Sequence, residues 1–257
     1  MTLRLCAALA LALTASAQQR PKLLAIFAHP DDETTVGPLL AHYVPQADVY
    51  LAIATNGDKG VQKFAGIPAG TPLAEARAKE AACACEKLGI NPPILIGFPD
   101  GELGTRSILS DLVPKIAKLI HDMRPDAIVT WGPDGGYGHP DHRLVSALVS
   151  QVVAEGGVTP LLYYVAVAKS RMTPEVAKGL SFLAPFSPTA DEYINARVLY
   201  SPADSTKAKE ALHCHKSQFE SQSMDQLYAI NEKMYQGTIF LRQWNGGPAK
   251  TDVFSRK

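Results

Sequence analysis

Short apolar runs that alternate with helical patterns limit the possible folds of this chain more than any other feature. Near-continuous apolar strands are typical of a parallel sheet buried on both faces, because crossover helices then cover each face. We therefore predict an α/β fold, an open, mostly parallel sheet with helices on both faces. The predicted strands are KLLAIFA (22–28), DVYLAIA (48–54), PPILIGF (92–98), DAIVTW (126–131) and LLYYVAVA (161–168), and the predicted helices cover residues 34–45, 73–89, 107–123 and 139–154.

The pattern becomes less regular after residue 168. Residues 169–195 are proline-rich and show no clear period, and a helical stretch follows at about 202–219. Residues 60–72 (GVQKFAGIPAGTP) are interpreted as an inserted loop. A chain of 257 residues suits one domain of this Rossmann-like kind, and no second boundary is visible, so we predict a single domain over residues 18–257.

The first residues have the composition of an export signal. Arg4 supplies a positive charge, LCAALALALTA is an apolar stretch too short to span a bilayer, and Ala15-Ser16-Ala17 is a small-residue cleavage site. We predict a signal peptide over residues 1–17, no membrane span after its removal, and a periplasmic or extracellular location. An uncleaved anchor is the alternative, because the positive region carries a single charge.

Charge and cysteine content exclude several classes of protein. The chain has 25 basic and 25 acidic residues and no basic stripe, so nucleic acid is not an expected partner. After the leader, Cys83, Cys85 and Cys214 remain. Cys83 and Cys85 are two residues apart in a helical pattern and point to different faces, so they cannot easily bridge each other. We therefore expect no disulfide framework and small, buried cysteine side chains.

Two related motifs follow two of the predicted strands. FAHPDDE (27–33) comes at the end of the first strand, and GYGHPDH (136–142) follows the strand at 126–131. Sites in open α/β sheets form at the carboxyl ends of strands, so the two motifs are expected to meet although about 110 residues separate them. Pro30 and Pro140 are each suited to the first position of a helix.

The residue types in the two motifs suit a metal site. Imidazole nitrogens and carboxylate oxygens are the ligands of catalytic zinc, which takes three protein ligands and leaves one position open. His29 and Asp32, like His139 and His142, are three residues apart and lie on one side of a helical turn. Asp31 is placed to act as a base toward water at such a site. The simpler alternative is that the acidic residues only favour a helix N-terminus.

These motifs resemble the two signature blocks of the PIG-L/LmbE-like family of zinc-dependent N-deacetylases. Shorter blocks also match: TNGDKG, in which Asp58 stands where many relatives have Glu, RAKEAACACEKLG, FPDGEL and ALHCHKSQF. The resemblance covers about residues 22–220. It implies a hydrolase that removes the N-acetyl group from an N-acetylglucosamine-type sugar or sugar conjugate and releases acetate and a free amine.

The resemblance also implies a role for each motif residue. His29, Asp32 and His142 would bind the metal, which is Zn²⁺, although Fe²⁺ suits the same ligands. Asp31 would be the general base. His139 would be a charged imidazole near the leaving amine. The flanking residues would complete the site: Asp141 orients His139, Tyr137 donates to the oxyanion, and Gly135, Gly136 and Gly138 let the loop close.

Other residues have weaker assignments. By the resemblance, Arg77 and Asp100 are candidates for binding substrate hydroxyls or charges, against ordinary roles on a helix or surface. His213, Cys214 and His215 are consecutive, and a helix would point them in different directions, so joint metal binding is not expected. His215 alone is positioned to approach the site, because it lies in the family-like ALHCHKSQF block near the C-terminus.

Two other functions fit part of this pattern. A metal phosphohydrolase also uses His and Asp ligands, but two-metal sites need more carboxylates than these motifs supply. A non-catalytic sugar-binding relative would not require the base Asp31. The physiological substrate and the oligomeric state are not predicted from the sequence.

Overall fold

The computed structural model describes residues 19–181 and 188–256, so the predicted leader and part of the irregular segment 169–195 lie outside the described residues. Within these ranges, no helix has the length and apolar character needed to cross a membrane. The described residues form one seven-stranded sheet in the order β3-β2-β1-β4-β5-β7-β6. Its strands are β1 (Lys22–Phe27), β2 (Asp48–Thr55), β3 (Ile94–Phe98), β4 (Ala127–Thr130), β5 (Leu161–Val165), β6 (Ala196–Leu199) and β7 (Thr238–Gln243).

The predicted fold class is confirmed. β1 pairs in parallel with β2 and β4, and the parallel pairing continues to β3 on one side and to β5 on the other. The sequence pattern missed β6 and β7, which extend the sheet in antiparallel pairing beyond β5. Both strands come from the irregular C-terminal third of the chain, where no alternation with helices marks them.

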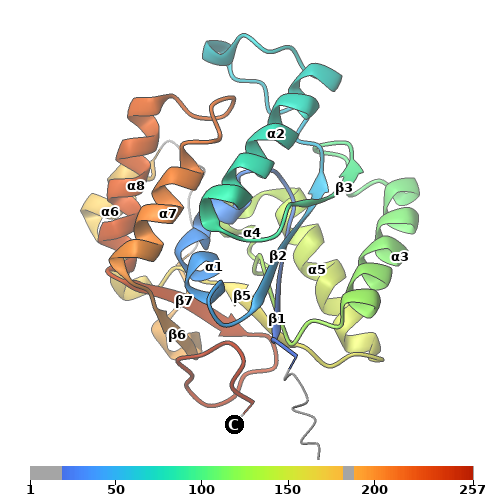
Figure 1. Ribbon diagram of the computed structural model, residues 1–257, viewed down its shortest axis with the longest axis vertical. Coiled ribbons are helices and arrows are strands. Elements are labelled where there is room, and N and C mark those ends of the chain that lie inside the picture. Colours follow the sequence, from blue (N-terminus) through green and yellow to red (C-terminus); the bar gives the residue numbers. More distant parts are fainter. Residues whose placement is uncertain (1–18, 182–187, 257) are drawn as a thin grey trace, which may run out of the picture.

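Helices cover both faces of the sheet (Figure 1). α1, α2, α6, α7 and α8 pack on one face, and α3 and α5 pack on the other. Their bounds are α1 (Gly37–Tyr43), α2 (Thr71–Leu88), α3 (Arg106–Met123), α4 (Gly135–Gly138), α5 (Pro140–Glu155), α6 (Pro174–Gly179), α7 (Pro202–Leu212) and α8 (Ser221–Tyr235), with 3₁₀ turns η1 (Asp32–Thr35), η2 (Lys63–Ala65), η3 (Lys169–Arg171) and η4 (Asp191–Tyr193).

The two faces of β1 explain why its sequence is apolar without interruption. Successive side chains in a strand point to opposite faces. Leu23 and Phe27 join the core under α1, α2 and α7, whereas Leu24 and Ile26 join the core under α3 and α5. All four side chains have no exposed area, so the central strand is held from both sides.

The order of the strands determines where a site can form. The chain proceeds outward from β1 through β2 to β3, and then returns through α3 to β4 on the other side of β1. The loops after β1 and β4 therefore diverge at a topological switch point, the place where open α/β sheets bind ligands. The two His-Pro-Asp motifs follow these two strands.

Two helical predictions need correction. The stretch predicted at 34–45 is divided into η1 and α1, with Pro38 in the first turn of α1. The stretch predicted at about 202–219 ends at Leu212, and α8 was not predicted. Glu220 precedes α8 without a side-chain cap, so the usual N-terminal signal is missing there.

The expectation of no disulfide was wrong. Cys83 of α2 is bonded to Cys214, which follows α7, across a sequence separation of 131 residues. The bond forms because α2 and α7 pack side by side, and helical periodicity does not report which helices are neighbours. Cys85 is buried and free, as expected.

We expect this disulfide to contribute about 4 kcal/mol to the free energy of unfolding, because it closes a long loop in the unfolded chain. Urea unfolding of the chain beginning at Gln18 should show this loss in the double variant Cys83→Ser/Cys214→Ser. Reductant should lower the wild type to the same value and leave the double variant unchanged. A Cys85→Ala control should keep its response to reductant, and an equal midpoint for oxidised and reduced wild type would contradict the prediction.

Candidate active site

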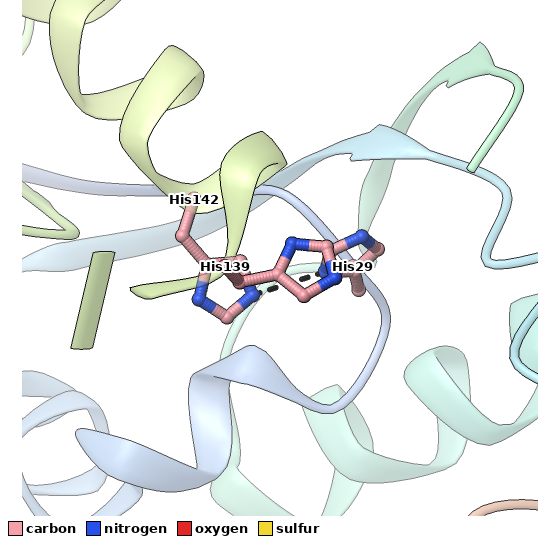
Figure 2. Close-up of side chains that lie close together, drawn as sticks. All are labelled: His29, His139 and His142. Atoms are coloured by element: carbon pink, nitrogen blue, oxygen red, sulfur yellow. Dashed lines mark hydrogen bonds between the residues drawn. The ribbon is translucent and has the colours of Figure 1, made fainter. Parts of the chain in front are cut away.

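The two His-Pro-Asp motifs meet at the switch point. Figure 2 shows the imidazoles of His29, His139 and His142 lying against one another, the first from the loop after β1 and the others from the start of α5. Their ring centroids are 4.6 to 5.1 Å apart. His142 has no exposed area and His29 is 6 % exposed. The expected convergence of the two motifs is therefore observed.

Asp32 fixes the loop after β1. Its Oδ2 accepts hydrogen bonds from the backbone N–H groups of Ala28 and His29 at 3.0 and 2.9 Å, and from Trp131 Nε1 at 2.9 Å. Trp131, which follows β4, also stacks on His142 with an interplanar angle of 4°. Burial opposes ionisation of Asp32, but the neighbouring His142 and His29 hold its pKa well below the ordinary value. Asp32 is thus a buried carboxylate anion that links β1 to β4.

The ring nitrogens of the two buried histidines face each other. His142 Nδ1 lies 3.1 Å from the carbonyl oxygen of Gly135, to which it can only donate, so its Nε2 is left to face the cluster. His29 Nε2 lies 3.0 Å from Asp100 Oδ1. His29 Nδ1 and His142 Nε2 are 3.1 Å apart, within hydrogen-bonding distance. Asp32 closes the group, with Oδ1 3.2 Å from His142 Nε2 and Oδ2 3.7 Å from His29 Nδ1.

A divalent cation fits this arrangement. Two imidazole nitrogens and a carboxylate this close together need a shared positive charge, which a proton or a divalent cation can supply, and ligating histidines commonly donate their other nitrogen to a carboxylate or carbonyl. Two overlapping groups offer further ligand atoms within 4.8 Å of one another: His29 with His139 and His142, and His29 with Asp100 and Asp141.

Asp100 and Asp141 lie on the other side of His29. Asp141 Oδ2 is 3.4 Å from His29 Nε2 and accepts a hydrogen bond from Gly101 N at 2.8 Å. Burial lowers the pKa of His29, but Asp100, Asp141 and Asp32 outweigh it and hold that pKa well above the ordinary value. Asp100, a candidate for binding substrate, is 8 % exposed and lies against His29. Asp141 was expected to orient His139, yet its carboxylate contacts His29.

His139 and Tyr137 border the cluster. His139 caps α5, where its Nδ1 accepts a hydrogen bond from the backbone N–H of Asp141 at 3.3 Å. Burial and the adjacent His29 and His142 lower the pKa of His139. The Tyr137 ring lies 5.2 Å from the ring of His142, and burial raises the pKa of its hydroxyl, which therefore stays protonated as a donor.

Asp31 has an unusual backbone and a fixed side chain. Its φ of 101° lies in the left-handed region, so the chain turns sharply before η1. Contrary to the prediction, Pro30 therefore does not occupy the first position of a helix. Arg77 Nη2 is 3.0 Å from Asp31 Oδ2 and also donates to Pro30 O, while Nη1 donates to Gly57 O at 3.1 Å. Burial raises the pKa of Asp31 to about 6, and the Arg77 guanidinium acts against that rise. The strained turn thus presents a carboxylate oriented by a cation.

Arg77 therefore supports Asp31. Its side chain, a candidate for binding substrate, is 3 % exposed. A Cβ at Gly57, where φ is +62°, would lie 2.4 Å from Arg77 Nη1, so this position requires glycine. This is the physical reason for the glycine in the TNGDKG block.

Sequence reasoning missed the roles of Trp131 and Glu33. Glu33 Oε2 accepts a hydrogen bond from Asp31 N at 3.0 Å, and its other oxygen contacts His215 Nε2 in a fully buried pair. The predicted approach of His215 to the site is thus seen as a contact with the Asp31 loop. Nearby, Ser217 donates from N and Oγ to the two oxygens of Glu80, each at 2.7 Å. The ALHCHKSQF block contains His215 and Ser217, but the sequence does not show that their partners are Glu33 and Glu80.

The strand order and the buried His/Asp cluster define an α/β protein with a polar site of metal-ligating type at its switch point. The family model described as GlcNAc-PI de-N-acetylase matches residues 24–153. The chain therefore belongs to the PIG-L family.

Two relatives of this chain carry the name of a deacetylase. A 1D-myo-inositol 2-acetamido-2-deoxy-α-D-glucopyranoside deacetylase of Mycolicibacterium smegmatis is 33 % identical in an alignment of 184 residues that covers 62 % of this chain and 63 % of the relative. A deacetylase of the same name from Rhodococcus opacus is 36 % identical in an alignment of 158 residues that covers 53 % of this chain and 54 % of the relative. The chain thus spans less than two thirds of the length of these relatives.

Solved structures share the fold. The N,N'-diacetylchitobiose deacetylase of Pyrococcus horikoshii has a TM-score of 0.62 and 22 % identity, covering 87 % of this chain and 84 % of its own. The A40926 pseudoaglycone deacetylase Dbv21 has a TM-score of 0.66 and 16 % identity, covering 88 % and 97 %. The 4-carboxy-2-hydroxymuconate hydratase GalB has a TM-score of 0.62 and 16 % identity, covering 90 % and 98 %. Because a hydratase shares it, the fold alone does not determine the reaction.

Replacing Arg77 by Met should leave the partly buried Asp31 without its cation and cost about 3–5 kcal/mol of unfolding free energy. Without Arg77 the Asp31 pKa rises above the value of about 6 found with it. The folded state then prefers the protonated acid, so the loss should grow as pH rises past 6 and be smaller at pH 5. Urea unfolding of chelator-treated protein at pH 5 and pH 8 measures this difference. The exposed Arg106→Met is the control, and equal losses in the two variants would contradict the predicted role.

Proposed function

We propose that this protein is a metal-dependent N-deacetylase that removes the N-acetyl group from an N-acetylglucosamine-type sugar or sugar conjugate. The observation that carries this proposal is the convergence of ring nitrogens of His29 and His142 and carboxylate oxygens of Asp32 beside the carboxylate of Asp31. Membership of the PIG-L family and the names of the relatives agree with it. The products would be acetate and a free amine.

We propose zinc as the metal, held by His29, Asp32 and His142, while ferrous iron suits the same donors. When bound, such an ion polarises a carbonyl oxygen and lowers the pKa of a water molecule toward about 7. Asp100 and Asp141 would keep the His29 proton on Nε2, so that Nδ1 remains free as a ligand.

The remaining residues would move protons and stabilise charge. Asp31 takes the proton of the attacking water, because its carboxylate is held beside the cluster by Arg77 while its backbone N–H bonds to Glu33. The protonated Tyr137 hydroxyl would donate to the developing oxyanion. The acquired proton on Asp31 would then go to the departing amine, which needs no charged form of His139. His139 would serve as a neutral hydrogen-bonding group.

The ligand assignment predicts the metal content of single variants. His29→Ala and His142→Ala should lose the divalent ion found by elemental analysis of the wild type, because each removes one of three donors. His139→Ala should keep it, and so should His42→Ala, a control whose imidazole lies near Asp204 at 3.4 Å. Full occupancy in the first two variants would remove both residues from the ligand set.

The same measurements separate the neighbouring aspartates. Asp31→Asn should keep the metal and lose about 10²–10⁴-fold in single-turnover acetate release, because an amide cannot accept the proton. Asp32→Asn should weaken metal binding itself. The reverse pattern would exchange the two roles. Hydrolysis of a phosphate ester without acetate release would instead favour a metal phosphohydrolase, and sugar binding without either reaction would favour a binding protein.

We also propose that the protein is exported, to a periplasmic or extracellular location, after removal of residues 1–17. The leader composition and the Cys83–Cys214 disulfide support this, since disulfides persist mainly in oxidising compartments. Intact-mass measurement of protein recovered from the cell envelope or medium should give the chain beginning at Gln18. Recovery with Met1 retained would mean that the leader is not cleaved.

A further inference from the structure

An apolar cavity adjoins the proposed catalytic groups. Its volume is about 100 Å³, and Asp31, Asp32 and Tyr137 form part of its wall. The rest of the wall includes Val167, which follows β5, and Leu227 of α8. A bound amide at the cluster would therefore have one substituent facing this cavity.

Most polar groups in the cavity wall are already engaged, and the carboxamide of Asn231 on α8 is the further polar side chain that lines it. Thr34 Oγ1 donates to Asp31 O at 2.7 Å, and Thr35 Oγ1 donates to Asp32 O at 2.8 Å. Tyr235 Oη donates to Thr35 O at 3.0 Å. Beyond the catalytic groups, Val165, Val167, Leu180, Phe219, Leu227 and Met234 supply apolar surface to the same wall. A cavity of this kind suits an alkyl group better than a sugar, whose hydroxyls each need a hydrogen-bonding partner.

The other side of the site has the opposite character. In the strand order β3-β2-β1-β4-β5, the cavity lies on the β5 side of the cluster. The loops after β2 and β3 lie on the other side and carry polar groups, including Asn56, Asp58 and Glu102, with Asp58 Oδ1 accepting from Asp100 N at 2.9 Å. An amide has one substituent on its carbon and one on its nitrogen. The polar side matches a sugar on nitrogen, which leaves the apolar cavity for the acyl chain.

We propose that this cavity is an acyl-chain subsite and that the enzyme hydrolyses N-acyl amino sugars with acyl groups longer than acetyl, up to about four carbons. This rests on the proposed amide hydrolysis and names its substrate class. A dry cavity of about 150 Å³ accepts benzene, so about 100 Å³ accommodates a shorter alkyl group. The reaction is the same: water adds to the carbonyl carbon, the C–N bond breaks, the amine takes a proton, and a short-chain fatty acid is released.

The test compares kcat/KM for N-acetyl-, N-propionyl-, N-butyryl- and N-octanoyl-glucosamine with the zinc-loaded protein. Each added methylene that enters the cavity should raise kcat/KM about fourfold up to butyryl, the gain expected from burying one CH₂ group. The octanoyl substrate should fall below butyryl, because its chain exceeds the space. If kcat/KM is highest for the acetyl substrate and lower for the butyryl substrate, the acyl-subsite proposal is overturned, while the deacetylase proposal stands. No acid release from any substrate would overturn both.

Two variants locate the effect in the cavity. Val167→Phe should reduce the butyryl-to-acetyl ratio of kcat/KM at least tenfold by filling the space, and Leu227→Ala should raise the octanoyl-to-acetyl ratio by enlarging it. Gln226→Ala, an exposed neighbour on α8, is the control that should keep wild-type ratios. If Val167→Phe fails to fold by circular dichroism, Leu227→Ala decides alone. Ratios that are unchanged in every folded cavity variant would overturn the proposal.

Discussion

The buried carboxylate of Asp32 joins the two strands on which the site is built. One of its oxygens accepts from the backbone of Ala28 and His29 after β1 and from Trp131 after β4, while the other faces His142 at the start of α5. A buried anion is costly unless it has hydrogen-bonding partners. The N–H groups of Ala28, His29 and Trp131 supply these partners from both sides of the switch point, so Asp32 joins the two loops.

Helix α2 supports the site from outside the motifs. At intervals of three residues along this helix, Arg77 contacts Asp31, Glu80 accepts two hydrogen bonds from Ser217, and Cys83 is bonded to Cys214. Residues three apart lie on one side of a helix. One side of α2 therefore orients the proposed base Asp31 and holds the ALHCHKSQF segment in place. This segment in turn positions His215 against Glu33.

The sheet divides the surroundings of the site by polarity. Polar loops follow β2 and β3, whereas β5 and α8 contribute apolar side chains on the other side of the cluster. This division follows from the topology, because the strands on the two sides of β1 come from different parts of the chain, and the loops that follow them lie at the same edge of the sheet. An amide bound between them would have different environments for its two substituents.

The sequence by itself determined the α/β class, because burial on both faces of a parallel sheet produces uninterrupted apolar strands. It also determined that His29 and His142 meet, since both motifs follow strands whose carboxyl ends share one edge. The tertiary structure alone decided that Arg77 and Asp100 contact Asp31 and His29, that Cys83 bonds to Cys214, and that an apolar cavity adjoins the site. Periodicity and motifs report which face of an element is buried, but the partners of a buried side chain depend on which helices dock together, and that docking joins segments far apart in the chain.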